Sequence, residues 1–479
     1  MIDGFSKHDW LTALQCPTQA WLSLQGGESP SESDLFRMQQ GQEVGELAKT
    51  LFPGGVVASG DDWRQHQDES ACFFEARFES DGFVARADIL VRLLDGWHVV
   101  EVKSSFADTK SIDELVDDLA YTVMVAEKSV TVTRASLLLL SRDYQYGDPP
   151  TSLFEERDVS EGAFSRAAAF RQSEEQVRNA LSDCGPPAAR LKSACRQCAW
   201  FAAECLGRDV EHSVLELPNL HQSKLEALAS RSVVSLSDLP ENFALTDTQA
   251  RVRDAVLTRR PVVSKKSLRE ALESVEWPCH YLDFETVATV LPLFPGLRCH
   301  EQVLTQYSVH HRETFDRECT HDEFLAENKR ECQWELAQSL IRALGTSGSV
   351  VVYSHFEKQR LRGLADRFHD ARPALAALED RLVDLLPIVR GNVYHPAFRG
   401  SYSIKSVLPV LVPDLSYEDL DISGGDTAIT RFARLVRGEI PDDRVAETRA
   451  SLLAYCKRDT EAMVRLHEAL WAMVASDGE

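Results

Sequence analysis

The sequence predicts an α/β protein built from two folded parts and a helical connector. Apolar strand patterns alternate with helical patterns along residues 1–209, and the same alternation returns along residues 276–479. Residues 210–275 show only short helical patterns that begin with capping residues. A length of 479 residues agrees with this division, because domains commonly hold about 150 residues. The expected domains are therefore 1–209, 210–275 and 276–479.

Composition and charge exclude some classes of protein. Hydrophobic residues make up 44% and charged residues 27%, which is ordinary for a globular protein and rules out wholesale disorder. The net charge of −23 argues against a protein that coats nucleic acid with a broad basic surface. It does not exclude a nuclease, because metal sites are themselves built from carboxylates. The first residues lack a signal-peptide pattern and no apolar stretch is long enough to cross a bilayer, so we expect a cytoplasmic protein without a membrane partner.

The expected elements follow from hydrophobic periodicity and from breaks at proline and glycine. The first domain should form helices near Lys7–Leu24 and Leu35–Leu51, strands between Ala71 and Ser104, a helix near Ile112–Glu127, a strand at Ala135–Leu140 and a helix after Pro150. The connector should form helices at Leu220–Ala229, Thr246–Leu257 and Ser267–Ser274. The last domain should form strands at His280–Phe284, Val303–Arg312 and Ser349–Tyr353, and helices at Asp322–Leu344, Glu357–Arg367 and Ala446–Val474.

A first candidate site lies on two alternating strands between residues 83 and 105. Asp95-Gly96 separates them, which is a strong signal for a two-residue hairpin turn. In that register Asp88 faces Lys103, and the period of two places Asp88, Glu101 and Lys103 on one face. Two carboxylates so placed can hold a hard divalent cation such as Mg²⁺, and the ammonium group can stabilise charge on an attacked phosphate. The alternative is an exposed hairpin with a cross-strand ion pair.

The cysteines suggest a metal centre. Three of the 11 cysteines crowd into one short segment, as Cys195, Cys198 and Cys205. In a reducing compartment such clusters are more often metal ligands than disulfides, and a tetrahedral set needs a fourth thiolate. Cys16, beside Pro17, is the best candidate for the fourth ligand, and the rivals in the same half are Cys72 and Cys184. A structural zinc site and unrelated buried cysteines are the alternatives.

A second candidate site lies in the last domain. Asp283 and Glu285 share one face of an apolar strand, which is costly unless a metal or another partner compensates their charge. Glu357 follows a buried strand at the start of a helix. Tyr455 and Asp459 are four residues apart on a long helix and therefore share a face. Taken singly, these patterns also fit an exposed edge strand and a contact on a helix surface.

The segment from Tyr394 to Lys405 is a further candidate for contact with nucleic acid. Glycine and small polar residues allow close approach to the backbone, and Arg399 and Lys405 could meet phosphates. Tyr402 could stack on a base. The alternative is an ordinary surface loop.

The order Asp88…Glu101-Val102-Lys103 resembles the core of PD-(D/E)XK nucleases. Together with the cysteines and the opening from Phe5 to Leu22, residues 5–206 resemble the iron–sulfur nucleases of the RecB-like family, among them CRISPR-associated adaptation exonucleases and AddB-type helicase–nucleases. That resemblance implies a 4Fe–4S cluster that staples the two ends of the nuclease fold, with the ligands Cys16, Cys195, Cys198 and Cys205.

This chain departs from that family at two places. Gly41-Gln-Glu-Val-Gly45 stands where a histidine is usual, and the helix after the lysine lacks the usual Gln…Tyr pair. Glu43 and Tyr121 are candidates to substitute for them. The second departure favours an alternative in which the N-terminal half binds DNA without cutting it.

The acids of the last domain resemble the DEDD exonucleases of the DnaQ-like, RNase H-fold superfamily. Asp283 and Glu285 match the first motif, and Glu357 stands where an aspartate is usual in the second. Asp459 matches the third motif, and Tyr455 indicates the tyrosine subtype. The resemblance implies two divalent ions, Mg²⁺ or Mn²⁺, bound by these acids, with Asp384 as a reserve ligand and Tyr455 orienting a water. Residues 210–479 also resemble a domain of unknown function that is often joined to RecB-like iron–sulfur nucleases in bacteria.

These resemblances imply a metal-dependent nuclease that hydrolyses phosphodiester bonds. The expected partner is nucleic acid, DNA rather than RNA, as DNA ends or single strands in repair or in defence against foreign DNA. Two alternatives stay open: an RNA 3′-exonuclease, and a DEDD nuclease whose N-terminal half is a non-catalytic DNA-binding module.

Overall fold

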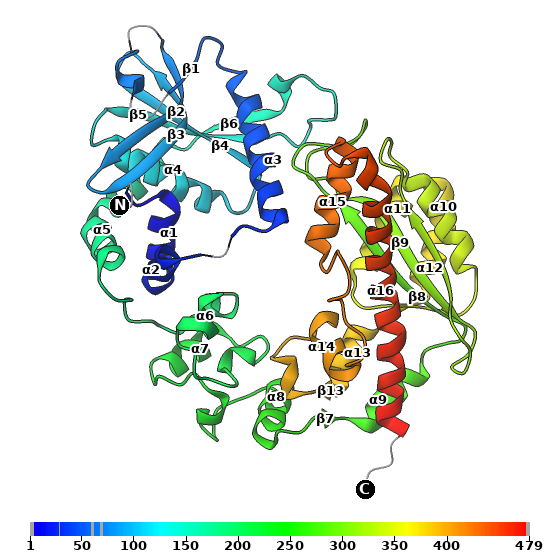
Figure 1. The fold of residues 1–479 in the computed structure, drawn as a ribbon. Helices are drawn as coiled ribbons and strands as arrows, with labels where there is room; N and C mark the ends of the chain where they lie inside the picture. Colours follow the sequence, from blue (N-terminus) through cyan, green and yellow to red (C-terminus); the bar gives the residue numbers. More distant parts are fainter. Residues whose placement is uncertain (1–3, 28, 59–61, 68–69, 476–479) are drawn as a thin grey trace. The chain divides into compact units, whose positions relative to one another are not determined.

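The computed structural model describes residues 4–27, 29–58, 62–67 and 70–475, and it confirms a mixed α/β protein (Figure 1). The chain divides into two compact units. Unit 1 contains Met1–Ala189 and Thr289–Glu301, and unit 2 contains Arg190–Ala288 and Gln302–Glu479. These limits differ from the predicted domains, because the connector and the cysteine triplet belong to unit 2 and residues 289–301 belong to unit 1.

Unit 1 is built on a six-stranded mixed sheet with the order β1-β2-β3-β4-β5-β6. β1 pairs with β2, and β4 with β5, in parallel, while the other neighbours are antiparallel. The strands are β1 (Val56–Val57), β2 (Cys72–Ser80), β3 (Phe83–Arg92), β4 (Trp97–Phe106), β5 (Val132–Leu140) and β6 (Phe154–Asp158).

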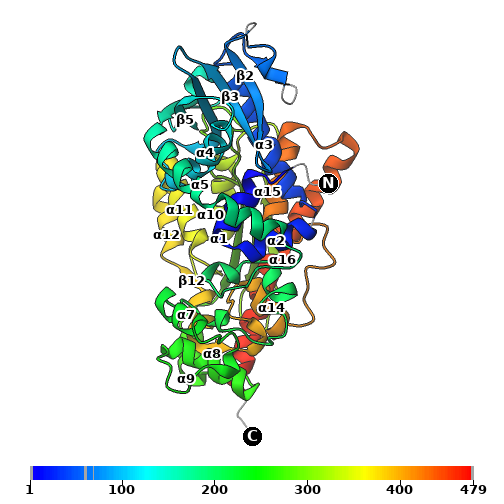
Figure 2. The same ribbon diagram turned by 90° about the vertical axis from the view of Figure 1, so that its left-hand side faces the viewer.

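The helices of unit 1 pack on this sheet in three hydrophobic clusters. They are α1 (Lys7–Gln15), α2 (Pro17–Gln25), α3 (Glu32–Lys49), α4 (Ile112–Ala126) and α5 (Ser160–Ser182). Residues of α1, α4 and α5 share one core with β2 to β5, and Figure 2 shows α4 and α5 beside the strands. α3 packs through Val44 and Ala48 into two other clusters, and Gln40 accepts a hydrogen bond at 2.8 Å from the backbone of Val290. The segment 289–301 therefore supports α3.

The hairpin register predicted around Asp95-Gly96 is wrong. Arg92 pairs with Trp97 and Ile89 with Val100, so four residues form the loop instead of two. The segment that leads into β5 decides this register, because the Trp97 N–H bonds the Thr131 carbonyl at 2.9 Å and a Cβ on Gly96 would lie 2.6 Å from that oxygen. The shift of two residues preserves the side-chain faces, and the pair Ile89 and Val100 lies next to Asp88 and Glu101 at the end of the ladder.

The single helix predicted at Lys7–Leu24 is two helices. Cys16 has extended backbone angles and separates α1 from α2, which begins at Pro17. Proline disfavours helical geometry in the residue before it but suits the first position of a helix. Cys16 therefore lies at a break between two helices.

Unit 2 has a five-stranded mixed sheet with the order β10-β9-β8-β11-β12. β8 (Cys279–Val287) is central: it pairs antiparallel with β9 (Val303–Arg312) and parallel with β11 (Ser349–Val352). β10 (Thr320–Leu325) and β12 (Leu382–Asp384) are the edge strands, and β7 (Val262–Val263) and β13 (Val393–Tyr394) form a separate pair. The predicted helix at Asp322–Leu344 is wrong over its first part, because residues 320–325 satisfy their backbone by pairing with β9.

The helices of unit 2 include one long element that crosses the sheet. They are α6 (Trp200–Glu204), α7 (Gln222–Ala229), α8 (Asp247–Thr258), α9 (Lys265–Glu273), α10 (Gln333–Leu344), α11 (Phe356–Arg367), α12 (Arg372–Glu379), α13 (Leu385–Asn392), α14 (Ile404–Leu411), α15 (Gly425–Arg437) and α16 (Asp442–Ala475). α10, α11 and α12 share a core with one face of β8 and β9, and α16 contacts the same two strands. The connector helices share a core with α13, α14 and the end of α16, which explains why they belong to unit 2.

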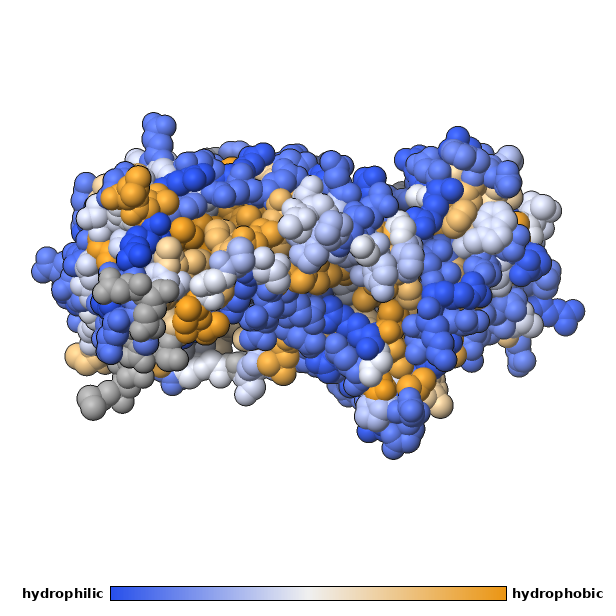
Figure 3. Space-filling model, turned by 90° about the horizontal axis from the view of Figure 1, so that it is seen from above, coloured by the Kyte–Doolittle hydropathy of each residue, from blue (hydrophilic) through white to orange (hydrophobic). Residues whose placement is uncertain are grey.

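The face of the molecule drawn in Figure 3 is mainly hydrophilic, with smaller hydrophobic patches. The large hydrophobic residues that are exposed among those described are Leu14, Leu35, Met38, Val56, Val57, Leu94, Tyr146, Leu257 and Phe315. Within the described ranges, none of the helices combines the length and the apolar character that crossing a membrane requires.

Candidate functional site

Three carboxylates of unit 2 meet between β8 and α16. Asp283 and Glu285 lie on β8, as the strand period requires, and Asp459 lies on α16. One oxygen of each carboxylate lies within 4.8 Å of the other two. The structure therefore brings together three residues that lie up to 176 positions apart in the sequence.

Buried hydrogen bonds fix α16 against the sheet and so position Asp459. The Tyr281 hydroxyl and His467 Nδ1 are 2.8 Å apart. Thr460 Oγ1, next to Asp459, lies 2.8 Å from Ser308 Oγ and 2.7 Å from His310 Nδ1. Because Ser308 pairs with Asp283 across β9 and β8, the same contacts set the position of α16 relative to both acids of the strand.

Burial raises the pKa of all three carboxyl groups, and repulsion between them raises it further for Asp283 and Glu285, which is the situation that a bound cation would relieve. Burial, and then the charge of Asp459, raises the pKa of Glu285 to about 8, and the same causes raise the pKa of Asp283 well above its ordinary value. Burial also raises the pKa of Asp459 to about 6, although a hydrogen bond from Tyr417 opposes this. A divalent cation would stabilise the ionised forms, and carboxylate oxygens are the ligands that Mg²⁺ and Mn²⁺ prefer. The residues present therefore fit such ions.

Glu357 lies close to this group but outside it. It is 4% exposed, lies in the first turn of α11 and accepts a hydrogen bond from Ser354 Oγ at 3.2 Å. Burial raises its pKa to about 7, and its charge in turn raises the pKa of Asp283 and Glu285. Asp384 caps α13 by accepting a 2.9 Å bond from the Leu386 N–H. Among the described residues, neither acid brings an oxygen within 4.8 Å of all three carboxylates.

Two tyrosines and a lysine complete the surroundings of the carboxylates. Tyr455 is 4% exposed, and its hydroxyl bonds Asp459, one turn further along α16. Tyr417, in the segment after α14, donates a 2.6 Å hydrogen bond to Asp459 Oδ1. Lys405 Nζ lies 5.5 Å from the ring centre of Tyr455 and 5.7 Å from that of Tyr417, and its charge lowers the pKa of Glu285 and Asp459. Sequence reasoning proposed Lys405 for phosphate contact but missed Tyr417, which no local pattern distinguishes.

The Cys456 thiol is also part of this site. It is fully buried and donates to Asp283 Oδ2 at 3.5 Å. Burial, and then the charge of Asp283, raises the pKa of this thiol well above its ordinary value. Cys456 is therefore a neutral donor to one of the three carboxylates.

The candidate site of unit 1 holds the predicted acids and two lysines. The Val102 N–H donates to Asp88 Oδ2 at 2.7 Å, which fixes that carboxylate on β3. Glu101 is 3% exposed, and its Oε1 accepts from Lys7 and, at 3.1 Å, from Lys103. Lys103 also forms an ion pair with Asp118 of α4. The structure thus brings Asp88, Glu101 and Lys103 together, and it adds Lys7, whose contact spans 94 residues.

In the candidate site of unit 1 the two lysines compensate the charge of Glu101 but not that of Asp88. Burial, and then the charge of Glu101, raises the pKa of Asp88 to about 7. Burial also acts to raise the pKa of Glu101, but Lys7 and Lys103 outweigh it and hold that pKa below its ordinary value. The second oxygen, Glu101 Oε2, is buried and has no hydrogen-bond partner among the described residues. An unpartnered carboxylate oxygen beside a second acid fits a divalent cation.

The two residues considered as substitutes in unit 1 have other contacts. The Tyr121 hydroxyl is buried and donates to the carbonyls of Phe5, at 2.9 Å, and Val84, at 3.0 Å. Glu43 accepts a 3.2 Å bond from Gln39 along α3 and does not line the cavity beside Asp88. Tyr121 therefore joins the N-terminal segment to the sheet.

The cysteines belong to both units. In unit 2, Cys195 lies in a turn, Cys198 follows it and Cys205 ends α6, and all three thiols are half-buried. In unit 1, Cys16 is half-buried, and Thr18 donates a 3.0 Å bond to the carbonyl of Pro187. This bond holds the chain that leads to the triplet beside the helix that follows Cys16.

Unit 1 also contains the two rival ligands. Cys184 is exposed. Burial raises the pKa of Cys72 to about 11, which disfavours the thiolate that binds metal. The four-thiolate set with Cys16 remains a prediction.

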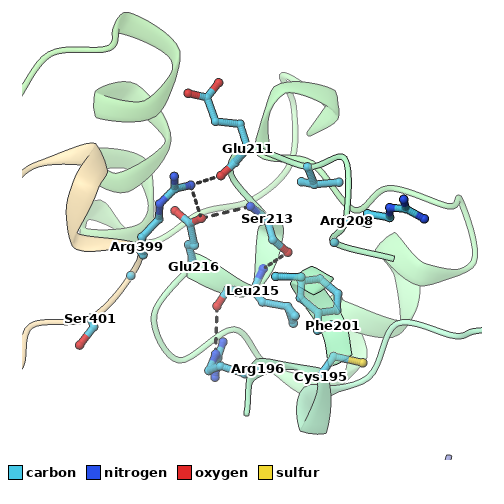
Figure 4. Close-up of a pocket in the computed structure, with 14 residues that line it drawn as sticks. Cys195, Arg196, Phe201, Arg208, Glu211, Ser213, Leu215, Glu216, Arg399 and Ser401 are labelled. Atoms are coloured by element: carbon cyan, nitrogen blue, oxygen red, sulfur yellow. Dashed lines mark hydrogen bonds and ion pairs between the residues drawn. The ribbon is translucent and has the colours of Figure 1, made fainter. Parts of the chain in front are cut away.

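The segment from Tyr394 to Lys405 borders a cavity of about 560 Å³ in unit 2 (Figure 4). The Arg399 guanidinium bonds the Glu211 carbonyl and lies 3.7 Å from the Glu216 carboxylate. The prediction that Tyr402 stacks on a base is wrong, because this residue is 6% exposed and its ring contacts the rings of Tyr394 and Phe398. Hydrophobic packing buries the Tyr402 ring, so the ring is not exposed for contact with a base.

Comparison with known proteins adds a family description without an activity. A family model described as a domain of unknown function, DUF2779, matches residues 280–403. The match contains Asp283, Glu285 and Glu357 and ends before Tyr455 and Asp459. No curated protein and no solved structure matches the chain.

Proposed function

We propose that this protein is a metal-dependent nuclease whose main site is the carboxylate group of unit 2. The observation that carries the proposal is the convergence of Asp283, Glu285 and Asp459 within 4.8 Å, with the Tyr455 hydroxyl on Asp459. Burying mutually repelling acids destabilises a fold, so a convergence of this kind needs a compensating ligand. In this proposal unit 2 has the DnaQ-like RNase H fold and digests strands from a 3′ end.

The roles of the residues follow from their positions. Asp283, Glu285 and Asp459 would hold the divalent ions, with Glu357 as the fourth acid. When bound, a pair of such ions supplies Lewis-acid activation of the phosphate and of the attacking water. Tyr455 orients that water through its hydroxyl, and Tyr417 fixes Asp459. Lys405 places a positive charge beside the acids, where a phosphate would enter.

We further propose a second nuclease site of the PD-(D/E)XK type in unit 1. Asp88 and Glu101 would hold a divalent cation, and Lys103 would stabilise charge on the phosphate. The buried, unpartnered Glu101 Oε2 supports this role. A 4Fe–4S cluster bound by Cys16, Cys195, Cys198 and Cys205 would join the two ends of this fold. DNA is the expected substrate, with RNA as the alternative.

Digestion of end-labelled DNA and RNA with Mg²⁺ or Mn²⁺ tests the main proposal. With unit 1 inactivated by Asp88→Ala in every protein compared, Asp283→Asn keeps the shape of the side chain, removes its charge and should abolish digestion. The matched control is Asp380→Asn, which removes an exposed carboxylate after α12 and should leave the rate unchanged. Equal rates for both variants and the parent protein would overturn the proposal, and digestion of RNA alone would select the RNA alternative.

A further inference from the structure

Two histidines face each other at one end of the sheet of unit 2. His280 on β8 and His311 on β9 are direct partners in the antiparallel ladder. Their Nδ1 atoms lie 2.7 Å apart, and the two ring planes make an angle of 74°. His280 is 8% exposed and the side chain of His311 is 14% exposed, so both rings are largely withdrawn from water.

The outer nitrogen of each ring faces an oxygen that can only accept a hydrogen bond. His280 Nε2 lies 3.1 Å from the Ser347 carbonyl oxygen. His311 Nε2 lies 3.0 Å from Asp322 Oδ2. Either oxygen would repel a lone pair at that distance, so we assign the ring proton to Nε2 in both histidines.

This assignment leaves two lone pairs facing each other. A neutral imidazole carries one proton, so each Nδ1 is an acceptor when Nε2 is protonated. Two acceptors 2.7 Å apart repel each other unless a second proton or a metal cation lies between them. Burial lowers the pKa of both histidines, although the charge of Glu313 acts against this at both rings and that of Asp322 at His311. Burial therefore disfavours the second proton, and the occupant that remains is a cation that binds nitrogen.

We propose that His280 and His311 bind a divalent transition metal ion of the zinc type. Imidazole nitrogen suits Zn²⁺, Cu²⁺ and Ni²⁺, whereas Mg²⁺ and Mn²⁺ prefer carboxylates such as those around Asp283. Zn–N bonds of about 2.0–2.1 Å place two nitrogens of one tetrahedral ion about 3.3 Å apart, so the rings need to open by about 0.6 Å. Histidine ligands of zinc commonly donate their second N–H to a carboxylate or a carbonyl, and Asp322 and Ser347 provide these partners.

The surroundings of the two rings carry charges of both signs. Glu313 follows β9 two residues after His311, is exposed and is the best further ligand. Among the described residues, no third ligand atom of a histidine, cysteine or acid lies within 4.8 Å of both Nδ1 atoms, so water would complete the coordination. Arg381, which bonds the Ser347 carbonyl, opposes a cation here, and the charges of Asp322 and Glu313 compensate it.

The proposed ion would join β8 to β9 on the face of the sheet opposite to the carboxylate group. His280 shares a face with Leu282 and Phe284, because side chains alternate along a strand, and these two residues pack in the core that contains α10, α11 and α12. Asp283 points to the other face. The site is therefore separate from the carboxylate group and does not depend on the proposed nuclease function.

Counting bound zinc tests this site. The full-length parent protein, His280→Gln and His311→Gln are dialysed against Zn²⁺ at pH 8, with excess Mg²⁺ to limit zinc binding at the carboxylate group, and Zn²⁺ per chain is measured by elemental analysis. Each variant should bind one Zn²⁺ fewer than the parent, because zinc at the cysteines contributes equally to all proteins. His369→Gln changes an exposed histidine of the same unit and should bind as much as the parent.

Thermal unfolding shows whether the variants fold and tests the facing lone pairs. In chelator at pH 8, His311→Gln should melt at the same temperature as the parent or higher, because the glutamine amide can donate to His280 Nδ1. Zn²⁺ should raise the melting temperature of the parent and of His369→Gln, and by less in His311→Gln. Asp322→Ala keeps both rings and should weaken zinc binding about 10–100-fold.

The outcomes separate a metal ion from a shared proton. Equal zinc counts in the parent, His280→Gln and His311→Gln overturn the proposal, and a lower melting temperature of His311→Gln in chelator would then assign the gap to a shared proton. If His311→Gln does not fold, Asp322→Ala decides. Weaker zinc binding with an unchanged melting temperature in chelator supports the site, and zinc affinity equal to that of the parent overturns it.

Discussion

Removing one charge from the carboxylate group should make the metal-free protein more stable. A rise in the pKa of Glu285 from 4.5 to about 8 corresponds to about 5 kcal/mol of destabilisation of its ionised form. Between these two values the folded protein holds a proton that the unfolded chain releases, so stability falls as pH rises through this window. Glu285→Gln removes this pH-dependent destabilisation. Above pH 8 we expect the free energy of unfolding of the variant to exceed that of the parent protein by about 2–5 kcal/mol, because the repulsion is shared with Asp283 and Asp459. Below pH 4.5 we expect little difference between the two proteins.

Thermal unfolding of the metal-free protein measures this effect. At about pH 9 the melting temperature of Glu285→Gln should exceed that of the parent protein by several degrees, and at about pH 5 by much less. Mn²⁺ should raise the melting temperature of the parent protein and have less effect on the variant. Glu241→Gln changes an exposed glutamate of the same unit and serves as the control. Identical melting curves for parent and Glu285→Gln at both pH values would refute the electrostatic argument.

Three other predictions concern the remaining candidate residues. Anaerobically purified protein should be brown and contain iron and sulfide. Cys198→Ser should lose both and destabilise the N-terminal half. Stoichiometric zinc without sulfide would contradict the proposed cluster. With unit 2 inactivated by Asp283→Asn, Asp88→Ala should remove the remaining cleavage; if no cleavage remains before this second change, unit 1 is a binding module. Tyr455→Phe should slow digestion about 10²–10⁴-fold with near-normal metal affinity, and an unchanged rate would remove Tyr455 from the mechanism.

Local sequence patterns predicted much of the fold and the residues of the carboxylate group. The strand period places Asp283 and Glu285 on one face, and the helix period places Tyr455 one turn before Asp459. Both relations depend only on the backbone of one element, so no knowledge of the tertiary structure is needed. The class of the fold followed in the same way from alternating strands and helices.

Features that depend on distant contacts were not predicted. Tyr417 reaches Asp459 from a segment with no regular pattern, and Lys7 reaches Glu101 across 94 residues. The register of β3 and β4 was wrong because Thr131 on the neighbouring chain segment, rather than the turn sequence, fixes Trp97. The connector helices were assigned to a separate domain, since their short amphipathic patterns do not show that their partners are α13, α14 and α16.

Digestion from a free 3′ hydroxyl tests the central proposal most directly. Strands with a free 3′ end and strands with a blocked 3′ end are compared with Mg²⁺, using the parent protein and Asp283→Asn, with unit 1 inactivated by Asp88→Ala in both. We predict that only the free 3′ end is digested, and only by the protein that retains Asp283. Equal digestion of blocked and free ends, lost in Asp283→Asn, would contradict the exonuclease proposal while leaving the metal site in place.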